Sequence, residues 1–162
     1  MGQIMGQIDL LIEMRKIFYD QQYLKALKIE EILKAKGWIY IGSGKDRRVW
    51  KKRNVVLKIA YTESGVLANK QEDYVFHNFK NDEIRYAPCR LVSDNILMMT
   101  AVSPLDDLDP VQLSRMPKWA FDLMDGPQVG ISKDGRILAY DYGEEKLEVM
   151  AGGNRAPSHN GG

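Results

Sequence analysis

The first part of the chain carries the hydrophobic pattern of an amphipathic helix. From residue 8 to residue 36 it contains no glycine or proline, and its apolar residues recur three or four positions apart. This period predicts one long helix, or two helices that join near Tyr19 and Asp20, where Asp20 can cap the second. Gly37 supplies a natural stop. The apolar face either packs against the chain's own sheet or forms a surface for a partner or for self-association.

Short apolar runs separated by turn residues follow, and they predict strands. Three runs occupy residues 38–41, 49–50 and 55–57, with Gly42-Ser43-Gly44 after the first and a short basic turn before the third. Lys58 follows the third run directly. A tight glycine turn leaves backbone N–H groups free to approach an anion, and a lysine on a neighbouring strand can neutralise a phosphate. An ordinary hairpin with a surface lysine is the structural alternative.

The rest of the pattern predicts one more helix and two more pairs of strands. Residues 64–79 have amphipathic spacing, with Leu67, Val75 and Phe79 as the expected buried side. Residues 86–102 are predicted to form two strands about a Ser-Asp-Asn turn, and residues 131–140 a hairpin that turns at Asp134-Gly135. Residues 151–162 are rich in glycine, asparagine, proline and serine, which predicts a flexible tail.

Charge and composition narrow the class of protein. Lysine and arginine total 23 and aspartate and glutamate total 22, so the net charge of +1 gives no support to binding of nucleic acid or of a membrane surface. The single Cys89 cannot form an internal disulfide and is expected to be a reduced, partly buried thiol. Because the sequence has neither a run of about 18 apolar residues nor a signal peptide, we expect a soluble cytoplasmic protein.

Two motifs, in this order, resemble those of protein kinases. In that family G-x-G-x-x-G-x-V precedes a strand that carries V-A-I-K. Here Gly42 and Gly44 fill the first two glycine positions, Val49 falls in register and Lys58 follows at a similar distance. After the late hairpin, the tripeptide that begins at Asp141 is similar to the metal-binding D-F-G motif. The resemblance covers about residues 38–143.

The resemblance implies an ATP site. Gly42, Ser43 and Gly44 would cover the phosphates, as the glycine-rich loop of a kinase does. Lys58 would contact the phosphates, held in place by an ion pair with Glu72 on the helix that follows its strand. The residues implied to surround the adenine base are Val49, Met98, Thr100 and Val102, with Met98 near the back of the pocket.

The resemblance also implies a Mg²⁺ site and an aspartate that orients the phosphate acceptor, and here the sequence departs from the family. Asp141 would hold Mg²⁺ against the phosphates, with Gln128 in place of the usual asparagine. Counting back to the position of the catalytic aspartate reaches Leu123. A one-residue insertion would give that role to Asp122, and Asp125 is the other candidate.

The fold that these patterns predict is α+β. It comprises an N-terminal helical annex (residues 1–37), a kinase-like amino-terminal lobe with a twisted antiparallel sheet (38–102) and a truncated second lobe with a hairpin of the catalytic type (103–150).

Two functions from different classes remain open. One is ATP and Mg²⁺ binding with phosphoryl transfer. The other is an inactive pseudokinase that binds or regulates a partner, which is favoured by Arg47 at the third glycine position and by the lack of room for a substrate-binding lobe. The compact chain resembles small kinase-like proteins of bacteriophages, which implies a host protein or a second copy as the partner of the N-terminal helices.

Overall fold

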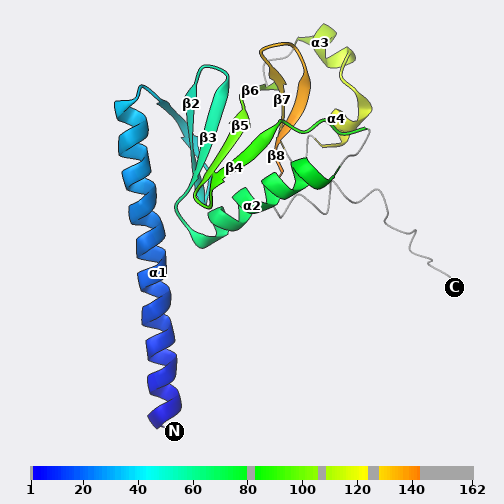
Figure 1. Ribbon diagram of the computed structural model, residues 1–162. Coiled ribbons are helices and arrows are strands. Elements are labelled where there is room, and N and C mark those ends of the chain that lie inside the picture. The colour runs from blue at the N-terminus through cyan, green and yellow to red at the C-terminus, as the bar shows by residue number, and fades with distance from the viewer. Residues whose placement is uncertain (1, 80–82, 106–108, 124–127, 143–162) are drawn as a thin grey trace, which may run out of the picture.

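The structure is a computed structural model, and it describes residues 2–79, 83–105, 109–123 and 128–142, without the side chains of residues 2–5, 8, 15–20 and 128. The predicted tail, residues 151–162, lies outside the described residues, as do Asp125 and Gly143. Helices and two antiparallel sheets make up the described chain, which confirms the α+β class (Figure 1).

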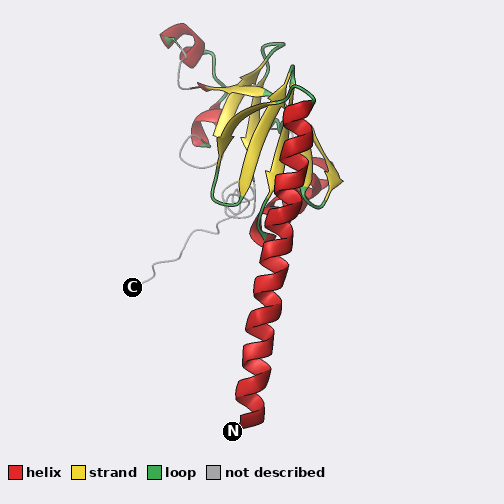
Figure 2. Cartoon of the chain, turned by 90° about the vertical axis from the view of Figure 1, so that its left-hand side faces the viewer, coloured by secondary structure: helices red, strands yellow, loops and turns green. Residues whose placement is uncertain are grey.

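The N-terminal segment is one continuous helix, α1 (Gly2–Ala35), so the alternative of two helices that join near Tyr19 and Asp20 is wrong. With no glycine or proline between residues 8 and 36, nothing interrupts its helical hydrogen bonds. In its C-terminal half Ala26 and Leu33 are buried against the sheet, whereas its N-terminal half projects past the sheet in both views (Figures 1 and 2). Neither α1 nor any other helix of the described residues is long and apolar enough to cross a membrane.

Five antiparallel strands form the main sheet, in the order β1-β2-β3-β5-β4. Side chains alternate between its faces, and the central strand β3 shows the consequence. Leu57 and Ile59 pack in the cluster that includes α1, while Val56 and Lys58 lie on the other face. The strands are β1 (Ile39–Ser43), β2 (Arg47–Lys52), β3 (Val55–Ala60), β4 (Cys89–Ser93) and β5 (Ile96–Thr100).

Helix α2 (Glu63–Asn78) lies on the face of the sheet away from α1 and begins at a side-chain cap. The Thr62 hydroxyl accepts a hydrogen bond from the Gly65 backbone N–H at 3.1 Å. A Cβ atom at Gly65 would lie 2.3 Å from the carbonyl oxygen of Asp46, so only glycine lets the first turn of the helix approach the β1–β2 turn this closely. This contact fixes where the following turns of α2 lie above the sheet.

The buried side of α2 differs in part from the prediction. Val75 is fully buried, as expected, but Leu67 and Phe79 are 49% and 42% exposed. The inward positions are instead taken by Asn69 and Glu72, both 0% exposed. The helix is therefore oriented by a polar cluster on the sheet as well as by apolar packing.

A second, three-stranded sheet carries the late hairpin, which turns at Asp134-Gly135 as predicted; Gly135 has a φ of +83°. Between its first two strands lie two short helices, α3 (Pro110–Ser114) and α4 (Lys118–Asp122). The strands are β6 (Val102–Pro104), β7 (Gln128–Ser132) and β8 (Ile137–Asp141).

Strand β8 is tied to the segment that precedes β4. The Ala87 N–H donates to the carbonyl of Ala139, and the Ala139 N–H donates to the carbonyl of Arg85, each at 2.8 Å. Buried residues from the main sheet, α2, α4, β7 and β8 then form one apolar core, against which Val102 of β6 packs. These contacts bring the end of β8, and with it Asp141, towards the face of the main sheet on which Lys58 lies.

Candidate functional site

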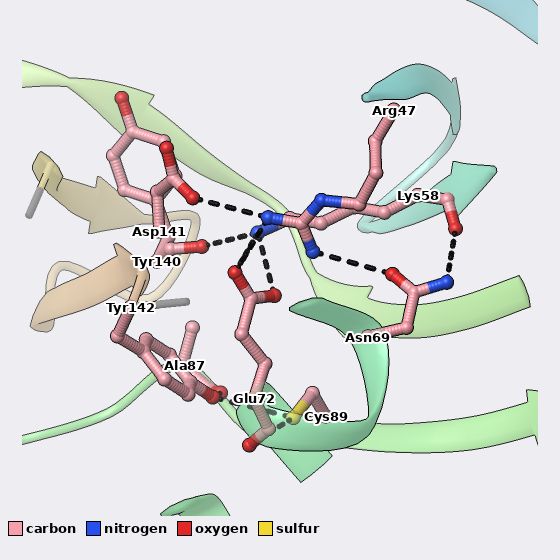
Figure 3. Close-up of polar contacts among 9 residues, drawn as sticks. All are labelled: Arg47, Lys58, Asn69, Glu72, Ala87, Cys89, Tyr140, Asp141 and Tyr142. Carbon is pink, nitrogen blue, oxygen red and sulfur yellow. Dashed lines mark hydrogen bonds and ion pairs between the residues drawn. The ribbon is translucent and has the colours of Figure 1, made fainter. Parts of the chain in front are cut away.

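The predicted ion pair between Lys58 and Glu72 is present and buried. The Lys58 ammonium lies 2.9 Å from one Glu72 carboxylate oxygen and 3.2 Å from the other, and the two side chains are 6% and 0% exposed. The same ammonium donates to the carbonyl oxygen of Tyr140 at 2.6 Å. Strand β3, helix α2 and strand β8 therefore meet at one lysine (Figure 3).

Asp141 reaches this cluster through Arg47. The Arg47 guanidinium donates from Nη2 to Glu72 at 2.8 Å and to Asp141 at 3.2 Å, and from Nη1 to the side-chain oxygen of Asn69 at 3.2 Å (Figure 3). Its side chain is 12% exposed. Burial works to lower the pKa of Arg47, but the negative charges of Glu72 and Asp141 and the hydrogen bond to Glu72 outweigh it, so the pKa is raised and the guanidinium stays charged.

The cluster is balanced in charge. Its two cations, Arg47 and Lys58, face two carboxylates, Glu72 and Asp141. Buried charges are tolerated when they are paired and hydrogen-bonded, and this arrangement meets that condition.

Asn69 also belongs to the cluster, although the sequence did not predict it as a site residue. It lies one helical turn before Glu72, accepts from Arg47, and its amide nitrogen lies 3.4 Å from the carbonyl oxygens of both Lys58 and Asp94. Its signal in the sequence was a polar residue three positions before the candidate glutamate, on the same face of an amphipathic helix.

Tyr142, which follows Asp141 in the chain, holds this end of the cluster in the core. The side chain is 0% exposed, its hydroxyl donates to the carbonyl oxygen of Ala87 at 2.8 Å and lies 3.2 Å from the sulfur of Cys89, and its ring lies 5.0 Å from that of Tyr86. Burial raises the pKa of Cys89 to about 11, so its thiol stays protonated at neutral pH. Tyr142 therefore anchors the chain in the core directly after Asp141.

The glycine turn lies near this cluster in the chain, because Arg47 begins β2 three residues after Gly44. Gly42 belongs to β1, and the Gly44 N–H donates to the carbonyl of Arg47 at 2.9 Å. Ser43 is exposed. Neither glycine has a positive φ, and no atom lies within 4 Å of the position that a Cβ would take at Gly42 or Gly44. The fold itself does not demand glycine at these two positions.

The residues expected around the adenine base are only partly brought together. Val49 packs against the core on the Lys58 face, but Met98 packs in the cluster with α1, on the opposite face of the sheet. Met99, 1% exposed, takes the inward position instead. Because side chains alternate along a strand, a difference of one residue changes the face.

At the end of β5 and just after it, backbone N–H groups donate hydrogen bonds to other segments of the chain. The Thr100 N–H donates to Pro88 at 2.9 Å, and the Ala101 N–H donates to Asn54 at 2.8 Å. Val102 begins β6 and pairs with Ser132. The N–H groups of Thr100 and Ala101 therefore do not offer the base the hinge contacts that the resemblance implies.

A pocket of about 350 Å³ lies next to this segment. Its lining includes Ala101 and Val102, Ile131 of β7, and the lysines Lys51 and Lys133. Of the residues predicted to surround the base, Val102 is the one that lines it.

Two residues predicted for catalysis and metal binding contribute no described side-chain contact to the cluster. Asp122 ends α4 and is exposed, and no described residue makes a hydrogen bond or an ion pair with it. The backbone of Gln128 pairs with that of Asp141, but the Gln128 side chain lies outside the described residues.

The described side chains do not fit a Mg²⁺ ion at Asp141. Both carboxylates of the cluster already accept from Arg47, and Glu72 also accepts from Lys58. Mg²⁺ requires near-octahedral oxygen coordination, and among the described residues no three Asp, Glu, His or Cys side chains gather as possible ligands.

No protein-family model matches the sequence, and neither does any curated protein. A solved structure of the streptomycin–ATP–APH(2″)-IIa ternary complex matches 58% of this chain at a TM-score of 0.39 and 18% sequence identity. The match covers 33% of that chain, so the present chain spans about a third of its length.

Proposed function

We propose that this chain is a kinase-like protein that binds ATP, with the phosphates held at Lys58. The observation that carries the proposal is the meeting of β3, α2 and β8, which lie far apart in the sequence, at the ammonium of Lys58. Glu72 and the Tyr140 carbonyl hold that ammonium at 2.9 Å and 2.6 Å. A lysine held in this way has lost the freedom of its long side chain before any phosphate arrives, so less entropy is lost on binding.

The glycine turn supports the same function. Gly42 and Gly44 are not required by backbone conformation or by packing, and space is open beside both. Residues without side chains let the backbone of the turn approach phosphate oxygens closely, while the Gly44 N–H itself donates to the carbonyl of Arg47. Because this hydrogen bond joins the turn to Arg47, a ligand that contacts the turn would also lie near the cations of the cluster.

ATP binding is expected to depend on Lys58. In isothermal titration calorimetry with the full chain, Lys58→Met is expected to weaken ATP binding by at least about tenfold, because a charge-assisted bond to phosphate is lost. The matched control is Lys70→Met, which removes an exposed lysine whose nearest carboxylate, on Asp94, is 3.8 Å away. It should change the affinity by no more than about twofold.

Circular dichroism would first verify that both variants fold. An absence of both heat and thermal stabilisation when ATP is added to the unaltered chain would refute the proposal. Equal ATP affinity in Lys58→Met and Lys70→Met would also refute it.

The second candidate is a pseudokinase that acts by binding a partner. Two observations favour it: Asp122 is exposed and makes no hydrogen bond or ion pair with a described residue, and α1 exposes an apolar stretch on the half that projects past the sheet. Leu10, Leu11, Ile12 and Met14 are each at least 50% exposed there. An apolar surface of this kind marks an interaction site more often than a solvated face.

This candidate predicts ATP binding without transfer of labelled γ-phosphate to the chain itself or to proteins of a cell extract. It also predicts association through α1, so Leu11→Glu should reduce oligomerisation in analytical ultracentrifugation or capture of a partner. Phosphate transfer, or a monomer that captures nothing, would contradict it.

A further inference from the structure

We infer that Arg47 takes the place of a divalent cation in this cluster, so that the site binds ATP free of metal. The inference rests on the proposed ATP site and concerns the form of nucleotide that this site accepts. It starts from the mismatch between the described carboxylates and a Mg²⁺ ion.

The first step is the position of the guanidinium. One nitrogen, Nη2, lies 2.8 Å from Glu72 and 3.2 Å from Asp141, so a single positive group bridges the two carboxylates (Figure 3). Residues 47 and 141 are 94 positions apart, and this contact ties the start of β2 directly to the end of β8. In the kinase motif that this segment resembles, residue 47 corresponds to a glycine, which has no side chain to fill the space.

The second step is the charge balance. With Arg47 in place, the two carboxylates Glu72 and Asp141 are already paired with cations. A divalent cation bound to Asp141 would lie next to Arg47, whose guanidinium is 3.2 Å from that carboxylate, and repulsion between the two cations opposes its binding. Asp141 could serve the metal only if Arg47 withdrew.

The third step is the set of donors left for a ligand. An arginine has five N–H groups. Three hydrogen bonds join the Arg47 side chain to described residues, all from Nη1 and Nη2, which leaves Nε–H and one further N–H without a described acceptor. Phosphate oxygens accept from guanidinium groups in paired geometry, so Arg47 can neutralise a phosphate in the way that a metal would.

The direct test needs no nucleotide. Mn²⁺ binding to the full chain is followed by the loss of the free-ion signal in electron paramagnetic resonance. Arg47→Gln, which keeps a polar side chain but removes the charge, should bind Mn²⁺ at least about tenfold more tightly than the unaltered chain. Adding Asp141→Asn to Arg47→Gln should abolish the gain.

The matched control is the neighbouring arginine. Arg48 pairs with Glu30 of α1 at 3.2 Å, on the opposite face of the same strand, so Arg48→Gln should leave Mn²⁺ binding unchanged. Arg47→Ala serves as the second variant if Arg47→Gln does not fold. Equal Mn²⁺ affinity in the unaltered chain and in the folded Arg47 variant would overturn the inference.

A second measurement uses nucleotide. The unaltered chain should bind ATP in excess EDTA within about threefold of its affinity in Mg²⁺, whereas Arg47→Gln should lose at least about tenfold in EDTA. ATP binding by the unaltered chain that requires Mg²⁺ would overturn the inference and leave the ATP site standing. If the chain binds no ATP in either buffer, the proposed function fails, and the Mn²⁺ titration still decides the role of Arg47.

Discussion

Replacing Glu72 with alanine is expected to lower the free energy of unfolding by about 3 to 5 kcal/mol. Glu72 is 0% exposed and is the shared acceptor of Lys58 and Arg47. Without it, the two cations would keep one ion pair among the described residues, that of Arg47 with Asp141 at 3.2 Å. Loss of one member of a buried, hydrogen-bonded ion pair costs far more than the pair contributes, because the charge that remains is desolvated and uncompensated.

Urea-induced unfolding, followed by circular dichroism, would measure this loss. The control is Asp94→Asn, which removes the partner of an exposed pair with Lys70 at 3.8 Å and should cost no more than about 0.5 kcal/mol. Similar losses in Glu72→Ala and Asp94→Asn would show that the buried cluster does not hold α2 on the sheet.

Tyr142→Ala should cost a similar amount, about 3 to 5 kcal/mol, for a different reason. Its ring is fully buried between Tyr86 and the core, so the substitution opens a cavity and removes the hydroxyl that bonds to Ala87. Burial raises the pKa of this hydroxyl above its ordinary value, so it is a neutral donor at neutral pH.

Tyr142→Phe separates the two contributions. It keeps the ring and removes the hydrogen bond to Ala87, so a loss of about 1 to 2 kcal/mol is expected in the same urea assay. Because Tyr142 adjoins Asp141, the alanine variant should also weaken ATP binding, while the phenylalanine variant should retain most of it. An alanine variant as stable as the phenylalanine variant would contradict the account of this anchor.

The sequence was informative where local chemistry dictates the structure. The Asp134-Gly135 turn and the Ser-Asp-Asn turn each join strands where the pattern placed them, whereas Gly42 and Ser43 extend β1 and the chain turns after them. The contact between Lys58 and Glu72 was predicted from a resemblance, and the structure forms it at 2.9 Å. Strong turn signals and a charged pair on adjoining elements need little knowledge of the remaining fold.

The predictions failed where tertiary contacts determine which side chains face the core. Whether Met98 or Met99 faces inward depends on the register of β5 against β3, which pairs Lys58 with Leu97, and a run of apolar residues does not reveal that register. The inward face of α2 was assigned by hydrophobicity, but the polar cluster turns Asn69 and Glu72 inward and leaves Leu67 49% exposed.

Arg47 shows the same limit at the site itself. Its presence at a glycine position was visible as a departure from the motif, but its contact with Asp141 spans 94 positions and could not be read from the sequence. The departure therefore signalled a changed site without indicating that the guanidinium would bridge two carboxylates.

The most direct test of the central claim is to identify the lysine that contacts the phosphates of bound ATP. An ATP acyl-phosphate probe transfers its acyl group to a lysine beside the terminal phosphate, and mass spectrometry of the peptides then locates the modification. We expect modification at Lys58, suppressed by excess ATP. Modification confined to Lys51 or Lys133, which line the separate pocket, or modification of Lys58 that excess ATP leaves unchanged, would contradict the proposed site.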